Sequence, residues 1–363
     1  MLPCPLYSDA GGYALGRIHV VVGGQFGSEG KGHVTAWLAR MLNPGAVVRV
    51  AGPNAGHTAY DDAGRAFALR QIPAAAVACD ASLVIAAGSE IDPLVLASEI
   101  DMLEEAGIPI RPRLVIDGMA TVIQPHHQQA EEELSGRIGS TGKGIGAARS
   151  DRIMRRALTW DTWRQEEGED WAKEFGPVRT DWFLENRLRS SDVIIEGTQG
   201  YGLGLHAGYY PYCTSSDCRA IDFLAMAGLT PNSNMTVWPV YRTFPIRVAG
   251  SSGPLRQERT WEDLAEATGG YIRPERTTVT QKTRRVGMWD PALAEISLRA
   301  NGGPAMCRPV LLFLDYWYPD LAGKAKLEDL TAQAIQSIEK VEFDLDCRVS
   351  AVGTGPDTII PLA

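Results

Sequence analysis

A glycine-rich segment with one lysine lies near the start of the 363-residue sequence and has the composition of a phosphate-binding loop. Its sequence, GGQFGSEGKG at residues 23–32, stands between an apolar run and a segment of helical periodicity. Backbone N–H groups in such a loop, together with the dipole of the following helix, attract phosphate, and Lys31 adds a positive charge. The spacing is not that of Walker A, since Gly32 follows the lysine where that motif has Ser or Thr. The segment predicts a nucleotide-phosphate loop, with a simple strand-to-helix turn as the alternative.

A second segment, AGPNAGHT at residues 51–58, directly follows another apolar run. It combines the amide of Asn54 and the imidazole of His57 with small residues that allow a ligand to approach the backbone. In α/β proteins, ligands bind where the carboxyl ends of the strands meet such loops. A lone histidine is more often structural than catalytic, but the small neighbours favour a functional role here.

Four further segments carry small, hydroxyl, amide or charged residues, and nearly all six segments lie close to the ends of predicted strands. They are STGKGIG (140–146) followed by Asp151, Arg155 and Arg156; EGTQG (196–200) with YPYCTSS (210–216); TTVTQKTRRVG (277–287); and Leu314-Asp315 with GTGPD (353–357). Hydroxyl groups and glycines beside arginines suit a phosphomonoester. Each segment alone is more consistent with a structural role, but six of them in one chain predict a shared binding site.

The elements that must position these segments alternate between strand and helix patterns. Strand-like runs, several of them continuously apolar, predict strands at 18–22, 47–50, 83–87, 114–116, 193–195, 237–241, 310–314 and 347–352. Helical patterns lie at 30–42, 92–106, 126–135, 180–189, 217–228, 290–300 and 327–340, and the Trp-rich stretch 160–182 predicts a small helical excursion. This alternation predicts an α/β fold with a large, mainly parallel sheet and helices on both faces. We expect residues 1–16 to form a tail and 17–363 a single domain.

The bulk composition limits the possible partners and location. A net charge of -9 and a pI near 5.3 argue against a duplex nucleic-acid surface or a basic membrane surface. The six cysteines (Cys4, Cys79, Cys213, Cys218, Cys307, Cys347) form no CxxC pair, which indicates reduced thiols and a cytoplasmic protein. We find no signal-peptide pattern and no apolar segment long enough to span a membrane.

Taken together, the motifs resemble the adenylosuccinate synthetase family, in order from residue 21 to residue 357. The most specific are GQFGSEGKG, AGPNAGHT, STGKGIG, EGTQG, YPYCTSS and GTGPD. The resemblance implies a ligase that joins L-aspartate to C6 of a purine nucleotide. The 6-oxo group is first phosphorylated by a nucleoside triphosphate, and the aspartate amine then displaces phosphate. It also implies Mg²⁺ as cofactor and a homodimer with shared sites.

The resemblance assigns roles by position. The catalytic residues would be Ser28, Lys31, His57 and Gln199, with Ser28 and the Gly56 carbonyl as metal ligands. The triphosphate would be bound by Gly27, Glu29, Gly30, Lys31, Gly32, Gly56, His57, Thr58, Asp315, Gly353, Gly355 and Pro356. The purine monophosphate would be bound by Ser28, Asn54, Ser140, Thr141, Gln199, Thr214, Lys282 and, from the neighbouring subunit, Arg155. Aspartate would be bound by Thr278, Thr280 and Arg284.

Three positions depart from the typical family pattern. Ser28 stands where typical members carry an Asp that acts as the base at purine N1 and contacts the metal, and a hydroxyl cannot replace it as an unaided base. Phe313 stands at the Lys of the Lys-x-Asp that reads the guanine of GTP, so only Asp315 remains and an adenine nucleotide becomes the expected donor. Lys282 replaces an Arg near the ribose, and these two side chains are not interchangeable at a bidentate site.

These departures resemble the viral branch of the family, the 2-aminoadenylosuccinate synthetases, which use dGMP and lead to diaminopurine in phage DNA. A serine leaves room for the 2-amino group of guanine and accepts a hydrogen bond from it. We therefore expect dGMP, ATP or dATP, and L-aspartate as substrates, in the host cytoplasm if the source is viral. The alternatives are an ordinary synthetase that uses IMP and GTP, and an inactive nucleotide-binding paralogue.

Overall fold

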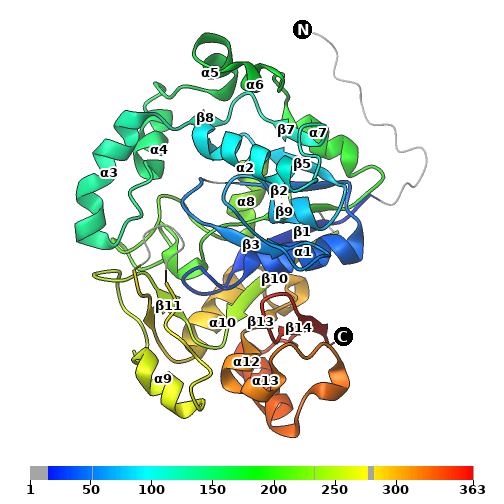
Figure 1. Ribbon diagram of the computed structural model, residues 1–363, viewed down its shortest axis with the longest axis vertical. Helices are drawn as coiled ribbons and strands as arrows, with labels where there is room; N and C mark the ends of the chain where they lie inside the picture. The colour runs from blue at the N-terminus through cyan, green and yellow to red at the C-terminus, as the bar shows by residue number, and fades with distance from the viewer. Residues whose placement is uncertain (1–14, 51, 233, 277–281, 363) are drawn as a thin grey trace.

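A nine-stranded sheet forms the centre of the protein (Figure 1), whose computed structural model describes residues 15–50, 52–232, 234–276 and 282–362. In spatial order the strands are β15 (Ile359–Pro361), β14 (Ala351–Gly353), β13 (Val310–Leu312), β10 (Met235–Arg242), β1 (Ile18–Gly23), β9 (Val193–Glu196), β2 (Ala46–Arg49), β5 (Ser82–Ile85) and β7 (Leu114–Ile116). Only β15, at one edge, pairs antiparallel with its neighbour. The predicted mainly parallel α/β sheet is thus confirmed.

Helices cover both faces of the sheet, which explains why its strands are largely apolar. The helices are α1 (Lys31–Leu42), α2 (Pro93–Glu105), α3 (Pro125–Ile138), α4 (Ile145–Ile153), α5 (Trp160–Glu166), α6 (Asp170–Lys173), α7 (Thr180–Arg187), α8 (Ala220–Ala227), α9 (Trp261–Ala267), α10 (Pro291–Ala300), α11 (Gly303–Met306), α12 (Leu314–Trp317) and α13 (Ala332–Leu345). Short 3-10 turns lie at Ala74–Val77, Tyr201–Leu203, Pro319–Leu321 and Leu327–Asp329.

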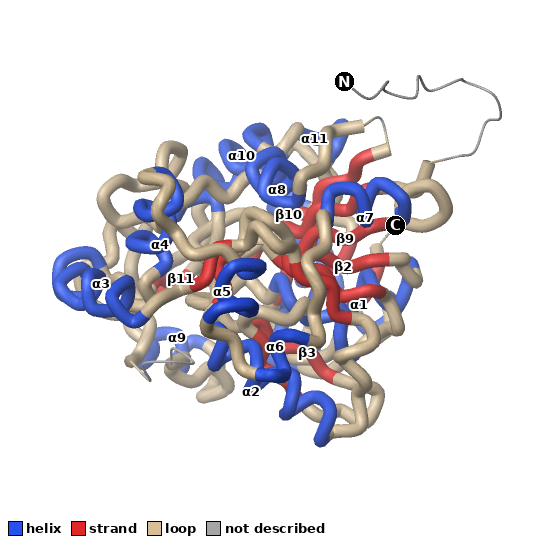
Figure 2. Tube along the Cα trace, turned by 90° about the horizontal axis from the view of Figure 1, so that it is seen from above, coloured by secondary structure: helices blue, strands red, loops and turns tan. Residues whose placement is uncertain are grey.

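The alternation of side chains along β1 shows how the two faces are filled. Val20 and Val22 belong to the core that contains residues of α8, α10 and α13. Val21 belongs to the opposite core, with Val34 and Leu38 of α1. Figure 2 shows α8 and α10 on one side of the strands and α1 on the other. Every side chain of β1 is therefore buried, and the strand is held rigidly beneath the loop that follows it.

All eight predicted strands are in this sheet, but some predicted boundaries were wrong. The strand expected at 347–352 begins only at Ala351, because the chain first leaves α13 through Asp346, whose backbone is left-handed. The helix expected at 327–340 begins at Ala332, because Thr331 caps it by accepting a hydrogen bond from the Ala334 N–H at 3.2 Å. Helix α4 was missed, since its glycine-rich start was taken for a loop.

The parallel topology brings distant motifs to one edge. The loops after β1, β2, β9, β13 and β14 all leave from carboxyl ends of strands, and they carry the two glycine-rich segments, EGTQG, Leu314-Asp315 and GTGPD. STGKGIG instead joins α3 to α4. Smaller pairs flank the sheet: β3 (His57–Tyr60) with β4 (Ala66–Leu69), β6 (Glu90–Ile91) with β8 (Thr121–Val122), and β11 (Ile246–Arg247) with β12 (Arg285–Val286). Among the described residues, none of the helices has the length and apolar character to cross a membrane.

Candidate active site

One cavity of about 760 Å³ opens at this edge of the sheet, and most of the predicted site residues line it. Its wall includes Gly27, Ser28, Gly30, Lys31, Gly32, Asn54, Gly56, His57, Thr58, Ser140, Thr141, Gln199, Lys282, Arg284, Asp315, Gly355 and Pro356. These residues come from loops separated by more than three hundred positions in the sequence. The fold therefore assembles the separate motifs into a single site.

The glycine loop after β1 is held in shape by a buried carboxylate. Glu29 is fully buried, and its Oε1 accepts hydrogen bonds from the backbone N–H groups of Gln25 at 3.1 Å and Gly27 at 2.7 Å. Its Oε2 accepts a bond from Lys31 Nζ at 2.7 Å. Glu29 thus points into the protein and occupies two loop amides that we expected to bind phosphate. It does not line the cavity, and its position is that of a brace for the loop.

The amides that remain for an anion lie at the start of α1. Gly30 caps this helix with a φ of 94°, a left-handed conformation that glycine adopts without strain. Gly32 lies against His57, because a Cβ at that glycine would be 2.7 Å from the His57 Cβ. The 12-residue helix directs its N-terminus and the Lys31 side chain at the cavity. This geometry suits the phosphates of a nucleotide.

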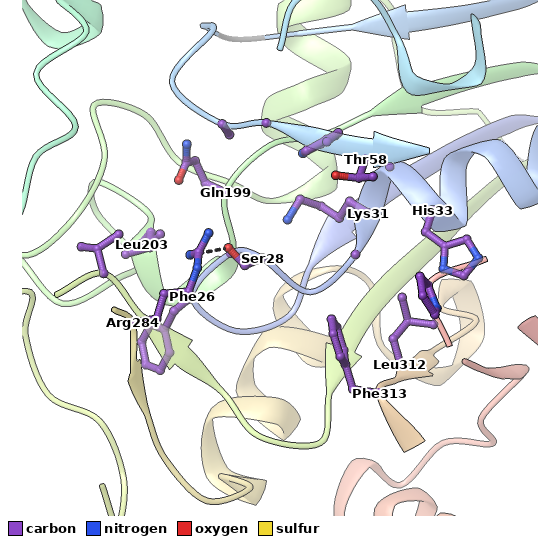
Figure 3. A pocket seen from close by; sticks show the side chains of 18 of the residues that line it. Phe26, Ser28, Lys31, His33, Thr58, Gln199, Leu203, Arg284, Leu312 and Phe313 are labelled. Atoms are coloured by element: carbon purple, nitrogen blue, oxygen red, sulfur yellow. Dashed lines mark hydrogen bonds between the residues drawn. The ribbon is translucent and has the colours of Figure 1, made fainter. Parts of the chain in front are cut away.

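Ser28, the residue that departs from the family pattern, is exposed to the cavity. Its Oγ accepts a hydrogen bond from Arg284 Nη1 at 2.8 Å (Figure 3), and its carbonyl accepts one from Arg242 Nη1 at 3.0 Å. Arg242 also forms an ion pair with Glu275. The serine hydroxyl is therefore presented to a ligand while its backbone is fixed from behind.

His57 is fixed by two buried residues that the sequence prediction missed. Its Nδ1 contacts Glu196 Oε1, which also accepts a bond from Arg49 Nη1 at 2.6 Å. Burial, and then the nearby Arg49 guanidinium, lower the pKa of His57 to about 4. Burial alone would raise the pKa of Glu196, but Arg49 and His57 hold it below its usual value. The free site thus contains a neutral imidazole beside an ionised carboxylate. Glu196 lies in the EGTQG motif at a strand end, which was a signal that could have identified it.

The part of the cavity around Phe313 forms a separate end, which is apolar and aromatic. Phe313 has a φ of 63°, and its ring packs 4.1 Å below the Arg242 guanidinium and edge-on to Tyr316. Asp315 is buried and accepts a hydrogen bond from the Tyr271 hydroxyl at 2.8 Å. Burial raises the pKa of Asp315. At this end Asp315 is already paired, and a flat aromatic surface stands where typical family members carry a lysine.

The cavity therefore has two chemically different ends. In Figure 3, Phe26, Leu203, Gln199, Ser28 and Arg284 gather on one side, while His33, Leu312 and Phe313 gather on the other. Lys31 extends between the two groups. His33 was not predicted as a site residue. The only sequence feature that could have indicated it is its position in the first turn of α1. Two ends joined at a lysine fit a nucleotide whose phosphates reach Lys31 and a second ligand that meets them there.

Some predicted site residues do not line the cavity. Gly353 is buried in β14, where a Cβ would lie 2.4 Å from Leu312 Cδ2, so it serves close packing. Thr214 donates its backbone N–H to the carbonyl of Leu203, a lining residue, at 2.8 Å. Arg155 is exposed away from the cavity wall. Thr278 and Thr280 lie outside the described residues.

The predicted metal ligands offer neutral oxygens only. Ser28 and Gly56 both line the cavity, but the Ser28 hydroxyl is bonded to a cationic arginine. Mg²⁺ prefers several oxygens, including substrate phosphates. This donor set fits Mg²⁺ only together with the phosphates of a bound nucleotide.

A second group of possible metal ligands lies outside this cavity. Within the described part of the chain, only His126, His127 and Asp151 bring three such atoms together. His127 Nδ1 accepts the Gln124 N–H at 2.9 Å, so its Nε2 carries a proton, which it directs at Asp151. That arrangement makes a structural hydrogen bond rather than a metal ligand.

This fold and cavity define a protein that binds nucleotide phosphates at the carboxyl ends of parallel strands. The family model described as adenylosuccinate synthetase matches residues 20–173 and 164–307. The chain belongs to the adenylosuccinate synthetase family. It is a C–N-forming ligase that joins aspartate to a purine nucleotide.

Individual relatives agree with this assignment. The adenylosuccinate synthetases of Methanococcus maripaludis (strain C5) and Methanocaldococcus jannaschii are 37% and 36% identical over 93% of this chain and 96% and 94% of their own. The solved succinoaminodeoxyadenylate synthetase of cyanophage S-2L, bound to dGMP and to dATP as energy donor, has a TM-score of 0.80 at 26% identity. It covers 96% of this chain and 95% of its own. The fully ligated Plasmodium falciparum adenylosuccinate synthetase has the same TM-score at 20% identity, covers 96% and 100%, and supports the fold alone.

Proposed function

We propose that this ligase joins L-aspartate to C6 of dGMP at the expense of ATP or dATP. The product would be N6-succino-2-amino-2′-deoxyadenylate, a precursor of diaminopurine for DNA. The observation that carries the proposal is Ser28, whose hydroxyl faces the cavity at the position of the family's carboxylate. A carboxylate beside purine N1 crowds a 2-amino group, whereas a serine hydroxyl accepts a hydrogen bond from it.

The reaction proceeds in two steps. In the first, the purine 6-oxygen attacks the γ-phosphorus, the nucleoside diphosphate leaves, and the N1 proton passes to water. Lys31 and the N-terminus of α1 stabilise the charge that develops on the transferred group, and His57 donates a hydrogen bond toward the 6-oxygen. In the second, the aspartate amine attacks C6 and phosphate leaves. Gln199 holds the purine, and Arg284 holds the aspartate carboxylates by two parallel hydrogen bonds.

Binding of aspartate prepares the purine site in this scheme. In the free protein Arg284 donates to the Ser28 hydroxyl. When Arg284 turns to an aspartate carboxylate, the lone pairs of the Ser28 oxygen become available to the guanine 2-amino group. The hydroxyl therefore serves one partner at rest and another in the complex.

Donor choice follows from the aromatic end of the cavity. Phe313 and Tyr316 line the cavity at this end, and Phe313 stands where typical family members carry the lysine that binds the guanine carbonyl. These features favour an adenine nucleotide. When Mg²⁺ is bound with the donor, it neutralises phosphate charge, and Ser28 and Gly56 would hold it from the protein side.

A homodimer would complete the monophosphate site. Arg155 is exposed next to Ile153 and Met154, whose side chains are 70% and 61% exposed at the end of α4. Exposed apolar side chains beside an arginine are typical of a protein interface. We propose that this surface meets a second copy and that Arg155 reaches the monophosphate of the neighbouring subunit.

Product analysis tests the proposed reaction. The protein is mixed with aspartate, Mg²⁺ and each pairing of dGMP, GMP, IMP or dIMP with ATP, dATP or GTP. Phosphate release and the mass of the succino product are measured, with a reaction lacking aspartate as control. We expect the succino product from dGMP with ATP and dATP. Absence of product from dGMP, with product from IMP, would contradict the proposal.

The second candidate is an ordinary adenylosuccinate synthetase that uses IMP and GTP. The observation in its favour is that the archaeal relatives with 36–37% identity carry that name. The same panel of nucleotides separates the two candidates, because the ordinary enzyme forms product from IMP and GTP.

A further inference from the structure

Three buried side chains at the back of the cavity form a connected group, and only one of them, His57, has been given a role above. Arg49 ends β2 and Glu196 ends β9, and the register of these parallel strands places them side by side. His57 begins β3 and contacts the same Glu196 oxygen as Arg49. Arg49, Glu196 and His57 are 1%, 0% and 7% exposed. A charged group this deeply buried is costly unless every part of it is bonded.

Glu196 is held from several directions. Its Oε1 accepts a bond from Arg49 Nη1 at 2.6 Å, and its Oε2 accepts the Ala74 backbone N–H at 2.7 Å. Arg49 is anchored in turn, since its Nη2 donates to the carbonyls of Ala55 at 3.0 Å and Arg70 at 3.1 Å. The carboxylate therefore has a fixed position before any ligand arrives.

We propose that Glu196 is a positioning residue of this ligase, which holds His57 through Nδ1 and leaves Nε2 for the substrate, while Arg49 fixes Glu196. The proposal rests on the role given above to His57, the donor toward the purine 6-oxygen. Glu196 itself does not line the cavity, so it acts only through His57.

The orientation of the ring follows from its surroundings. An ionised carboxylate against Nδ1 places the proton of the neutral ring on that nitrogen, which also lies 2.5 Å from Arg49 Nη1. Nε2 therefore donates toward the 6-oxygen only when His57 takes up a second proton, and Glu196 stabilises that imidazolium. Nε2 has no hydrogen-bond partner among the described residues, and His57 lines the cavity. On its other side the His57 Cβ is packed against Gly32, where a Cβ would approach to 2.7 Å. The ring is thus clamped between α1 and Glu196, in the way that a third group orients the base of a catalytic triad.

This arrangement predicts that the loss of Glu196 lowers turnover and not substrate binding. Positioning matters most for the hydrogen bond that strengthens during phosphoryl transfer, so kcat falls while KM changes little. Because Glu196 acts through His57, we expect the losses of kcat in the two single variants not to multiply in the double variant.

The test is a double-mutant cycle of Glu196→Gln and His57→Asn, in the full-length protein with dGMP, ATP and aspartate. We expect each single variant to lower kcat by at least about 10-fold, with KM values for dGMP and ATP within about threefold. The double variant is expected to match His57→Asn alone. Exchange of ¹⁸O between the bridging and non-bridging positions of ATP, without aspartate, reports the phosphoryl step and should slow in parallel.

Glu99→Gln is the matched control. Glu99 is also buried, and it accepts the backbone N–H groups of Arg70, Gln71 and Ile72 at 2.6, 3.1 and 2.9 Å, without contacting His57. It supports the same segment of chain, so Glu99→Gln lowers stability but leaves kcat per folded molecule unchanged. If Glu196→Gln does not fold, Glu196→Asp keeps the charge beside Arg49 and withdraws it from Nδ1, and is expected to show the same loss of kcat.

The possible outcomes distinguish a failure of the positioning role of Glu196 from a failure of the proposed role of His57. Activity retained in His57→Asn would overturn the proposed role of His57. Loss in His57→Asn together with full activity in the Glu196 variants would overturn only the positioning role. Losses that multiply in the double variant would show that Glu196 acts independently of His57 and would likewise overturn the inference.

Discussion

Arg284 Nη1 donates a hydrogen bond to Ser28 Oγ over 2.8 Å, so an arginine of the predicted aspartate-binding segment rests on the residue that replaces the family's carboxylate. With an aspartate at position 28 the same contact would be an ion pair. A neutral hydroxyl holds the arginine less firmly, since hydrogen bonds between a charged and a neutral group are weaker than ion-paired ones. Ser28 therefore affects both the base pocket and the freedom of Arg284.

Restoring the carboxylate tests both effects. Ser28 has a φ of 58°, a left-handed conformation that Asp adopts more readily than most residues, so Ser28→Asp leaves the loop intact. We expect kcat/KM for dGMP to fall at least about 10-fold relative to IMP. KM for aspartate should rise, because Arg284 is now held by an ion pair. Ser28→Ala is the control, with a loss for dGMP of about fivefold from one missing hydrogen bond. An unchanged dGMP-to-IMP ratio in Ser28→Asp would refute the role of Ser28.

Arg284→Lys separates charge from geometry at the aspartate site. A lysine keeps the positive charge but cannot bind a carboxylate by two parallel bonds. We expect KM for aspartate to rise by about 10-fold, with little change in KM for dGMP, as measured in steady-state kinetics. Arg256→Lys, at an exposed pair with Asp290, is the control and should leave both values unchanged. An unaltered aspartate KM in Arg284→Lys would remove this residue from the site.

Phe313→Lys tests the donor end. The substitution introduces the lysine of the family's guanine-reading pattern and removes the ring that packs 4.1 Å from the Arg242 guanidinium. We expect GTP to gain relative to ATP in kcat/KM, and stability to fall by about 1 kcal/mol through the lost cation–π contact. Phe313→Leu, which keeps an apolar side chain, should lose stability without an increase in kcat/KM for GTP relative to ATP. Equal donor preference in the lysine variant and the parent would show that Phe313 does not set donor choice.

His33 predicts how stability depends on pH. Burial lowers the pKa of His33 from 6.5 to about 4, so the unfolded chain binds this proton more readily than the folded protein. The free energy of unfolding should therefore decrease as pH falls from about 6.5 to about 4, with a slope from His33 near 1.4 kcal/mol per pH unit. Urea titrations of His33→Gln should show a slope smaller by about that amount. Between pH 7.5 and 8.5 the two proteins should have the same slope, and a parallel decline below pH 6.5 would contradict the assignment.

The sequence predicts the central sheet well because its parallel strands are buried on both faces. Runs such as 18–22 are apolar at four of their five positions, and His19 is buried with them. Boundaries set by caps were harder, as at Thr331, where one side-chain hydrogen bond moves the start of α13 by several residues. The antiparallel edge strand β15 was not predicted, since its three residues give too short a pattern.

The site was predicted from motifs at strand ends. The residues that this prediction missed are buried behind those that line the cavity. Ser28, Lys31 and His57 face the cavity, as expected of loop residues after parallel strands. Arg49 has the sequence pattern of an ordinary strand residue, and Glu196 was predicted only as part of the EGTQG motif. The register of β2 and β9 brings the two together. The orientation of Glu29 toward the protein interior could not be predicted from the sequence either, because its partners are backbone amides of its own loop. Contacts of this kind depend on three-dimensional neighbours that spacing does not encode.

Direct competition between dGMP and IMP tests the central claim most directly. Equal concentrations of the two nucleotides are supplied with ATP, Mg²⁺ and limiting aspartate, and the two succino products are quantified by mass. Their ratio equals the ratio of the kcat/KM values. If Ser28 opens the base pocket to guanine, the 2-amino product predominates by at least about 10-fold. Predominance of the product from IMP would contradict the account.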